Sequence, residues 1–175
     1  MRHFFIDETK RAGYVIAAVS VAVPAATRGV VRGLVAPGRR RLHMVDERPR
    51  HRPIIIDTLL SCDIEAWIYN AGRAHRTERE ARAACLRALV ADLAALGGST
   101  RLIIELDRTL GGADRSVLYQ ASRRSPRRGF DLHYDHRTSH EELLLGLPDV
   151  IAWCWARSAE WRRRIMPVVT RVRSV

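Results

Sequence analysis

Runs of apolar residues separated by polar turns predict a sheet combined with helices. Continuous apolar runs are typical of buried strands, and strict alternation of apolar and polar positions is typical of half-buried strands. On this basis we expect strands over residues 3–7, 14–23, 64–69, 100–105 and 131–134. The first two form an antiparallel hairpin, because the short segment between them contains Gly13 and reads as a turn.

Helical spacing and end signals predict the helices between these strands. The best-specified helix begins at the capping box Thr77–Glu80 and ends before Gly97. Shorter helices are expected over residues 24–36, 53–61 and 113–122. A second capping box, Ser139–Glu142, opens a last helix that Pro148 interrupts or restarts. The order of elements predicts a mixed α/β sheet covered by helices.

The length and the apolar content indicate one domain over residues 1–175. The chain has 175 residues, of which 47% are hydrophobic, which is enough for a sizeable core. Within this domain we expect a flexible basic loop over residues 37–53 and a basic tail over residues 162–175.

The formal net charge of +11 makes nucleic acid the leading class of partner, with an acidic protein next. Lys10 is the only lysine, and the planar arginine side chain suits phosphate recognition. Ordinary solvated surface is the alternative for each arginine run. The expected phosphate contacts are Arg39, Arg40, Arg41, Arg123, Arg124, Arg127, Arg128, Arg162, Arg163 and Arg164.

The cysteines and the ends of the chain predict a cytoplasmic protein. Cys62, Cys85 and Cys154 are isolated and lack C-x-x-C spacing, so we expect reduced core residues. Acids occur by position 7, which is not the pattern of a signal peptide. No apolar stretch is long enough to span a bilayer. Trp153, Trp155 and Trp161 are interpreted as core residues instead of base-stacking platforms.

Three acids at the ends of separate apolar elements predict a divalent-metal site. Asp7 follows the first strand, Glu105 ends the fourth, and Asp149 begins the apolar segment before Trp155. A carboxylate in such a position costs free energy unless it is hydrogen-bonded, paired or bound to metal. Oxygen ligands of this kind suit Mg²⁺ or Mn²⁺. The alternative is that each acid caps or terminates its own element.

Strand geometry narrows the choice among neighbouring acids. Successive side chains on a strand point to opposite faces, so Asp7 and Glu8 cannot both face the site. Asp7 is preferred, because its shorter side chain holds a metal more rigidly. Glu105 and Asp107 share a face, so either one is a candidate ligand.

Four segments in order resemble the DUF3800-type proteins, a group with a ribonuclease H-like fold. These segments are Phe5–Glu8 with the following strand, Leu42–Met44 with Glu47, Leu102–Glu105, and Leu147–Ala152. The segment from Leu147 to Trp155, with Trp161–Arg164, resembles in particular an uncharacterised actinobacterial branch.

The resemblance implies a ribonuclease H-like fold, a mixed five-stranded sheet flanked by helices. Three strands would be antiparallel and two more parallel. Asp7, Glu105 and Asp149 would meet at one metal site as catalytic residues. Asp107 is an alternative ligand. The fourth-strand acid is commonly Asp in ribonuclease H-like nucleases, and the glutamate here makes the metal spacing less defined.

Four further residues are candidates for the surroundings of the site: Glu8, His43, Glu47 and Glu141. His43 with Glu47 would form a proton-transfer pair, and a surface histidine is the alternative. Glu141 lies upstream of Asp149 on a helical count.

These features lead to two hypotheses about function. The first is a Mg²⁺- or Mn²⁺-dependent nuclease that hydrolyses phosphodiester bonds of RNA or DNA by a two-metal mechanism. The second is a non-catalytic nucleic-acid- or protein-binding module that retains the fold.

Overall fold

Six strands form a single sheet in the computed structural model, which describes residues 1–107, 109–124 and 129–175. The strands are β1 (Arg2–Thr9), β2 (Tyr14–Val21), β3 (Ile64–Gly72), β4 (Gly98–Glu105), β5 (Phe130–Arg137) and β6 (Val169–Ser174), and their order across the sheet is β5-β4-β1-β2-β3-β6. β2 runs antiparallel to both β1 and β3, whereas β4 is parallel to β1 and β5 is parallel to β4. The mixed sheet and its antiparallel and parallel parts are therefore confirmed.

The expected number of five strands is wrong, because the tail contributes a sixth. β6 pairs parallel with β3 at the edge of the sheet. Its exposed Arg173 alternates with aliphatic residues, and charged side chains are common on edge strands because they discourage further pairing. Basic and aliphatic residues alternate in this segment, which on sequence alone is interpreted as a basic tail and not as a strand. The segment expected as a basic tail thus belongs to the folded domain.

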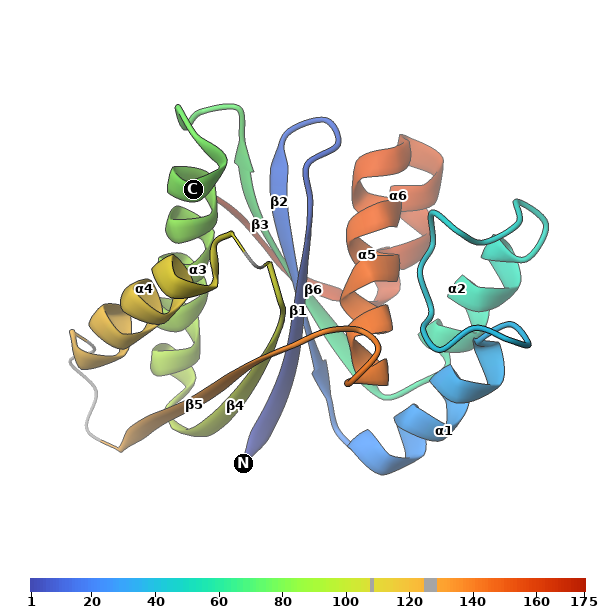
Figure 1. Ribbon diagram of the computed structural model, residues 1–175, viewed down its shortest axis with the longest axis horizontal. Helices are drawn as coiled ribbons and strands as arrows, with labels where there is room; N and C mark the ends of the chain where they lie inside the picture. The colour runs from blue at the N-terminus through green and yellow to red at the C-terminus, as the bar shows by residue number, and fades with distance from the viewer. Residues whose placement is uncertain (108, 125–128) are drawn as a thin grey trace.

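Helices cover both faces of the sheet, as expected (Figure 1). α3 (Glu78–Leu96) and α4 (Gly111–Arg123) lie on one side. On the other side lie α1 (Pro24–Leu34), α2 (Arg52–Leu60), α5 (Gly146–Arg157) and α6 (Ala159–Ile165). α3 has the predicted capping, because Thr77 Oγ1 accepts a hydrogen bond from the Glu80 N–H at 3.1 Å. Gly97 ends it with a φ of 71°, which a glycine adopts without strain.

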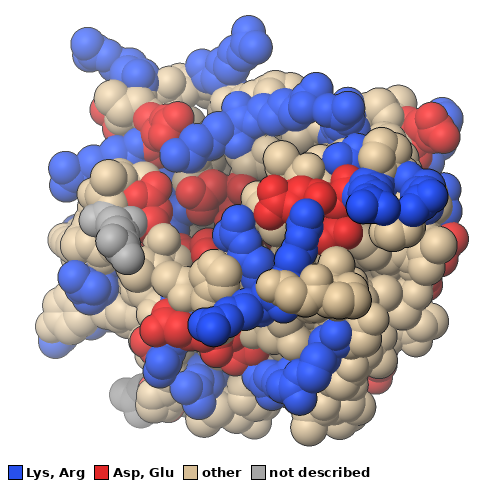
Figure 2. All heavy atoms as spheres, turned by 45° about the vertical axis from the view of Figure 1, so that its right-hand side comes forward, with Lys and Arg blue, Asp and Glu red and all other residues tan. Residues whose placement is uncertain are grey.

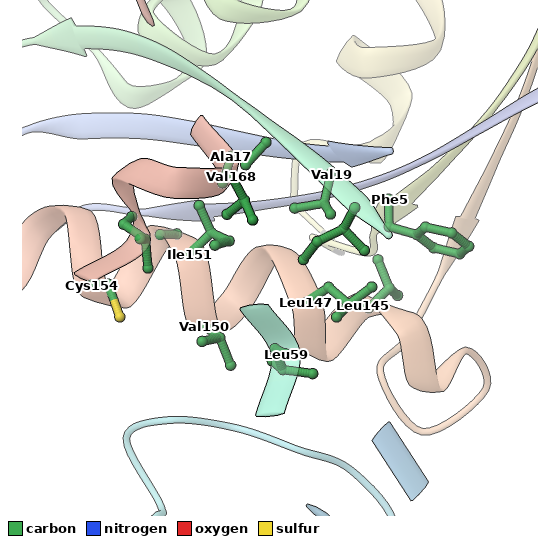
Figure 3. Packing of buried hydrophobic residues seen from close by; sticks show 14 of the residues in the cluster. Phe5, Ala17, Val19, Leu59, Leu145, Leu147, Val150, Ile151, Cys154 and Val168 are labelled. Carbon is green, nitrogen blue, oxygen red and sulfur yellow. The ribbon is translucent and has the colours of Figure 1, made fainter. Parts of the chain in front are cut away.

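Alternation along β1 divides the core between the two faces. Phe4 and Ile6 pack in the cluster under α3 and α4, whereas Phe5 packs in the cluster under α5. Figure 3 shows this second cluster, in which Leu147 and Ile151 of α5 lie against the sheet residues Phe5, Ala17 and Val19. Because side chains alternate along a strand, Asp7 lies on the same face of the sheet as Phe5, the face that α5 covers.

The start of the last long helix differs from the expectation. Ser139 is not its cap, because the carboxylate of Glu141 accepts hydrogen bonds from the N–H and hydroxyl of Thr138, at 2.8 and 2.9 Å, in a turn. Glu142 then caps a short 3-10 helix over Leu143–Leu145. α5 begins only at Gly146 and contains Pro148 in its first turn. Proline is tolerated there because its missing N–H would have no partner inside the helix.

The segment expected as a flexible basic loop is anchored to the core at two positions. Leu42 and Met44 are completely buried against α5 and its neighbours. Gly146 allows this approach, since a Cβ atom there would lie only 3.0 Å from Leu42 Cβ. The segment is therefore held beside the first turn of α5.

Within the described residues, none of the helices combines the length and the apolar character needed to cross a membrane.

Candidate carboxylate site

The three predicted acids line one cavity of about 320 Å³, where the carboxyl ends of β1 and β4 meet the first turn of α5. Ligands of open α/β sheets commonly bind outside the carboxyl ends of strands. The charged and polar residues that line the cavity are Asp7, Glu8, Thr9, Lys10, Arg41, His43, Glu105, Ser139 and Asp149. The structure therefore brings Asp7, Glu105 and Asp149 together from three separate elements.

Asp7 is the most strongly perturbed acid of this cavity. Its Oδ1 accepts a hydrogen bond from the Glu8 N–H at 2.8 Å. Burial raises the pKa of Asp7 well above its ordinary value, and the neighbouring carboxylates of Asp149, Glu8 and Glu105 raise it further. Among the described residues, neither Asp7 nor Glu105 forms an ion pair, although the chain carries 30 lysines and arginines. The cavity thus brings several carboxylates together, and among the described residues neither Asp7 nor Glu105 is paired with the lining cations Lys10 and Arg41.

Glu8 is directed to the other face of the sheet, where Arg82 of α3 binds it. Arg82 is only 1% exposed, and its Nη1 donates to Glu8 Oε2 and, at 3.3 Å, to the Tyr14 hydroxyl. Its Nε and Nη2 donate to the buried carboxylate of Asp114, which also lies 3.1 Å from His136 Nε2. Arg82 therefore neutralises one acid beside the cavity and leaves Asp7 without a cation.

The structure distinguishes Glu105 from Asp107, whereas the sequence left both as candidate ligands. Glu105 lines the cavity, and its Oε1 accepts a hydrogen bond from the Ser139 N–H at 3.1 Å. Burial raises the pKa of Glu105 despite these hydrogen bonds from Ser139. Asp107 lies beyond the end of β4, outside the lining, and its Oδ1 accepts hydrogen bonds from the N–H and hydroxyl of Thr109. Those bonds lower the pKa of Asp107, so it serves a turn.

Asp149 is held by the segment that packs on α5. Its Oδ2 accepts a hydrogen bond from the Met44 N–H at 2.7 Å, and its Oδ1 lies 2.7 Å from His43 Nδ1. The hydrogen bond to Asp149 raises the pKa of His43 above its ordinary value. His43 and Asp149 both line the cavity, so this contact fixes the orientation of the Asp149 carboxylate. Sequence reasoning placed His43 near the site but did not find this partner.

The remaining candidates near the site have partners of their own. Glu47 is buried and pairs with Arg39 at 3.3 Å, so it does not bond to His43. Glu141 is bonded to Thr138, outside the cavity lining. Neither residue contacts the three acids.

The arginines predicted to contact phosphate fall into several environments. Arg41 lines the cavity and lies 3.7 Å from Asp46, and Arg40 is exposed. Arg162 donates to the Trp155 carbonyl, and Arg164 pairs with Asp57. Arg123, Arg124 and Arg163 are exposed, whereas Arg127 and Arg128 lie outside the described residues.

The donors of the cavity suit a hard divalent cation. They are mainly carboxylate oxygens, which Mg²⁺ and Mn²⁺ prefer as ligands. In the described part of the chain, however, no three His, Cys, Asp or Glu side chains are already close enough together to hold a metal ion. A cation would have to draw the side chains together, and Glu105 has the longest side chain of the three.

Comparison with solved structures identifies the architecture. The chain is similar to the ribonuclease HII of Archaeoglobus fulgidus, solved with PCNA, with a TM-score of 0.58 over 94% of this chain and 75% of that one, at 14% identity. It is also similar to the ribonuclease H2 of Pyrococcus horikoshii, with a TM-score of 0.55 over 87% of this chain and 70% of that one, at 12% identity.

The fold is ribonuclease H-like.

This finding confirms the fold expected from the resemblance but reaches no further than the fold, because the identities are so low. No protein-family profile and no curated protein sequence matches the chain. The DUF3800-type resemblance and its actinobacterial branch therefore rest on the sequence motifs alone.

Proposed function

We propose that this protein is a Mg²⁺- or Mn²⁺-dependent nuclease that hydrolyses phosphodiester bonds of RNA or DNA. The observation that carries the proposal is the cluster of Asp7, Glu105 and Asp149 in one cavity of a ribonuclease H-like fold. Burial raises the pKa of Asp7, and the neighbouring carboxylates of Asp149, Glu8 and Glu105 raise it further. Such a site is unfavourable alone and becomes favourable when a divalent cation binds.

The acids of the cavity and their hydrogen-bond partners have distinct roles in this proposal. Asp7, Glu105 and Asp149 would hold two divalent ions, which would activate water and stabilise the leaving oxygen. The Met44 N–H and His43 orient Asp149, and Ser139 orients Glu105. Arg82 holds Glu8 away from the ions. Asp107 is not needed, because it caps its own turn.

Nucleic acid as the partner is supported by charge. The net charge of +11 favours a polyanion, and association with it would weaken as salt is added. Figure 2, which brings the α5 and α6 side forward, shows Lys and Arg side chains surrounding several acidic groups. Within this proposal the basic surface binds the phosphate backbone of the nucleic acid, and the acids hold the ions that catalyse hydrolysis. A cytoplasmic location and membership of the DUF3800-type group belong to the same proposal.

A non-catalytic nucleic-acid-binding module is the second candidate. It is favoured by the finding that no three metal-ligand side chains in the described residues are already within reach of one ion. In this case the acids would remain without metal, and only the basic surface would function.

Incubation with nucleic acids separates the two candidates. Single-stranded RNA, single-stranded DNA, duplex and hybrid substrates are each incubated with Mn²⁺ or with EDTA. The nuclease proposal expects cleavage that requires metal and that is lost in Asp7→Asn. Asp131→Asn is the matched control, since Asp131 is an exposed acid of β5 that bonds to His133. Salt-sensitive binding without cleavage, unchanged by Asp7→Asn, would establish the second candidate instead.

A further inference from the structure

Two arginines from different segments stack on Trp153, on the α5 side of the molecule. The Arg52 guanidinium carbon lies 4.9 Å from the centroid of the Trp153 ring, and that of Arg157 lies 5.5 Å from it. Trp161 of α6 meets the same ring edge-on, with 5.3 Å between centroids. Trp153 and Trp161, which were expected to be core residues, pack against the core cluster under α5 but are only partly buried. The aromatic ring therefore fixes two cationic side chains at the surface.

These two guanidinium groups differ from that of the neighbouring Arg164. In the described part of the chain, neither Arg52 nor Arg157 forms an ion pair with a carboxylate. Arg164, by contrast, pairs with both carboxylate oxygens of Asp57, at 2.8 and 3.0 Å. Arg162 is directed to the Trp155 carbonyl. The stack on Trp153 is thus ordered but retains its positive charge.

The position of Arg52 is not explained by helix stability. It is the first residue of α2, where the helix dipole disfavours a cation. Its Nε donates to the Met44 carbonyl at 3.2 Å, which holds it in place. Arg157, at the other end of α5, does complement the helix dipole, so its presence has a structural reason as well.

The stack is directly connected to the carboxylate cavity. Met44 donates its N–H to Asp149 and accepts the bond from Arg52 through its carbonyl. Asp149 and Trp153 are four residues apart on α5 and therefore share a helix face, with a rise of about 6 Å between them. Arg157 lies one turn further along the same face. Asp149, Trp153 and Arg157 thus follow one another along α5, and Arg52 of α2 lies over the Trp153 ring.

We propose that the Arg52–Trp153–Arg157 stack binds the phosphate backbone of a nucleic-acid strand and leads it along α5 into the carboxylate cavity. The proposal deepens the proposed function and rests on it for the identity of the cavity. An arginine held over an aromatic ring by a cation–π contact can still donate its terminal N–H groups to phosphate oxygens. The acids alone would repel a phosphate, so adjacent fixed cations would be needed to bring a strand to them.

Equilibrium binding tests this surface without requiring cleavage. Fluorescence anisotropy of a labelled single-stranded oligonucleotide is measured in EDTA over a series of salt concentrations. The control variant Arg171→Gln with Arg173→Gln removes the same charge from β6, where both arginines pair with Asp92 and Arg171 also stacks on Trp67. Thermal unfolding of each variant establishes that it is folded.

The double variant Arg52→Gln with Arg157→Gln should bind about tenfold more weakly than the control. The slope of log affinity against log salt should become shallower by about 1.4, which corresponds to two lost phosphate contacts on a single strand. Oligonucleotide binding should also quench the intrinsic fluorescence, and Trp153→Phe should remove most of that quenching. Equal affinity and equal slope in the two double variants would overturn the proposal.

Cleavage assays on the same variants separate this inference from the proposed reaction. If the wild-type protein binds through the stack but cleaves nothing with Mn²⁺, the binding surface stands and the nuclease proposal fails. If the wild-type protein cleaves and Arg52→Gln with Arg157→Gln leaves KM unchanged, the nuclease proposal stands and the binding surface is refuted.

Discussion

Arg82 of α3 binds Glu8, whereas the adjacent Asp7 has no cationic partner among the described residues. The two acids are neighbours in the sequence but face different sides of the sheet, so one arginine neutralises only one of them. A buried charge is tolerated when it is paired and hydrogen-bonded, which describes Glu8. Above its raised pKa, Asp7 carries a buried charge that no ion pair neutralises among the described residues, and a bound cation would relieve the cost of that charge.

Asp7→Asn should stabilise the metal-free protein. The substitution removes a buried charge that the neighbouring carboxylates repel, and we expect the Tm to rise by about 2–4 °C, the equivalent of about 1 kcal/mol in a domain of this size. Differential scanning calorimetry in EDTA measures this rise in Tm. Millimolar Mn²⁺ should raise the Tm of the wild-type protein but not that of the variant. A Tm of the wild-type protein that is independent of metal would contradict the site.

The stability of the wild-type protein should also depend on pH through Asp7. Its raised pKa means that the folded state binds the proton more tightly than the unfolded state. The contribution of Asp7 to the free energy of unfolding should therefore become less favourable as the pH rises from about 3.8 through the raised pKa. The acids that raise this pKa further are Asp149 of α5, Glu8 of β1 and Glu105 of β4, and Lys10, Arg41 and His43 line the same cavity. Urea unfolding in EDTA should show a smaller decline with pH in Asp7→Asn than in the wild-type protein.

Glu105→Gln and Asp107→Asn should have opposite consequences. Glu105 lines the cavity, so Glu105→Gln should abolish metal-dependent cleavage and the stabilisation by Mn²⁺. Asp107 binds Thr109 and lies 3.9 Å from Lys10, so Asp107→Asn should cost only about 1 kcal/mol of stability and leave cleavage intact. Cleavage rates and melting curves of the two variants are compared side by side. Loss of cleavage in Asp107→Asn alone would reverse the assignment.

His43→Ala should weaken metal binding without removing a ligand. His43 holds Oδ1 of Asp149, while the Met44 N–H still holds Oδ2. Loss of such an orienting hydrogen bond typically weakens metal affinity by about 10–100-fold. The concentration of Mn²⁺ that gives half-maximal cleavage should rise by about that factor, with the maximal rate largely recovered at high Mn²⁺. An unchanged Mn²⁺ dependence would show that His43 does not orient Asp149.

Asp114→Asn should remove an acid-sensitive part of the stability. Burial alone would raise the pKa of Asp114, but hydrogen bonds from His136 and Arg82 lower it below its ordinary value of 3.8. A lowered pKa stabilises the fold above about pH 4, and this stabilisation is lost as the pH falls through the lowered value. The partners of Asp114 come from α3 and β5, and Glu8 and Tyr14 face the same guanidinium. Urea unfolding between pH 2 and 7 should therefore show a weaker acid dependence in the variant.

The sequence identified the three acids because each one interrupts an apolar pattern. Alternation along β1 placed Asp7 and Glu8 on opposite faces, and the shorter side chain favoured Asp7 as the ligand; the structure gives the two acids different partners. Alternation could not separate Glu105 from Asp107, since both would share a face if the strand continued. The structure ends β4 at Glu105, so the turn at Thr109 decides between them.

Other features depend on contacts between distant segments and could not be predicted. His43 and Asp149 are 106 residues apart, and only the packing of Leu42 beside Gly146 brings them together. The Arg82 network did have a signal in the sequence: Arg82 lies one turn before Leu86 on the apolar face of α3. An arginine in such a position must have buried acidic partners, but the sequence does not say which ones.

Anomalous diffraction from crystals grown with Mn²⁺ tests the central claim most directly. We expect a manganese peak in the cavity, with carboxylate oxygens of Asp7, Glu105 and Asp149 at about 2.0–2.3 Å from the ions it contains. A cavity without manganese at saturating concentration, with the three carboxylates still apart, would contradict the metal site and the nuclease built on it.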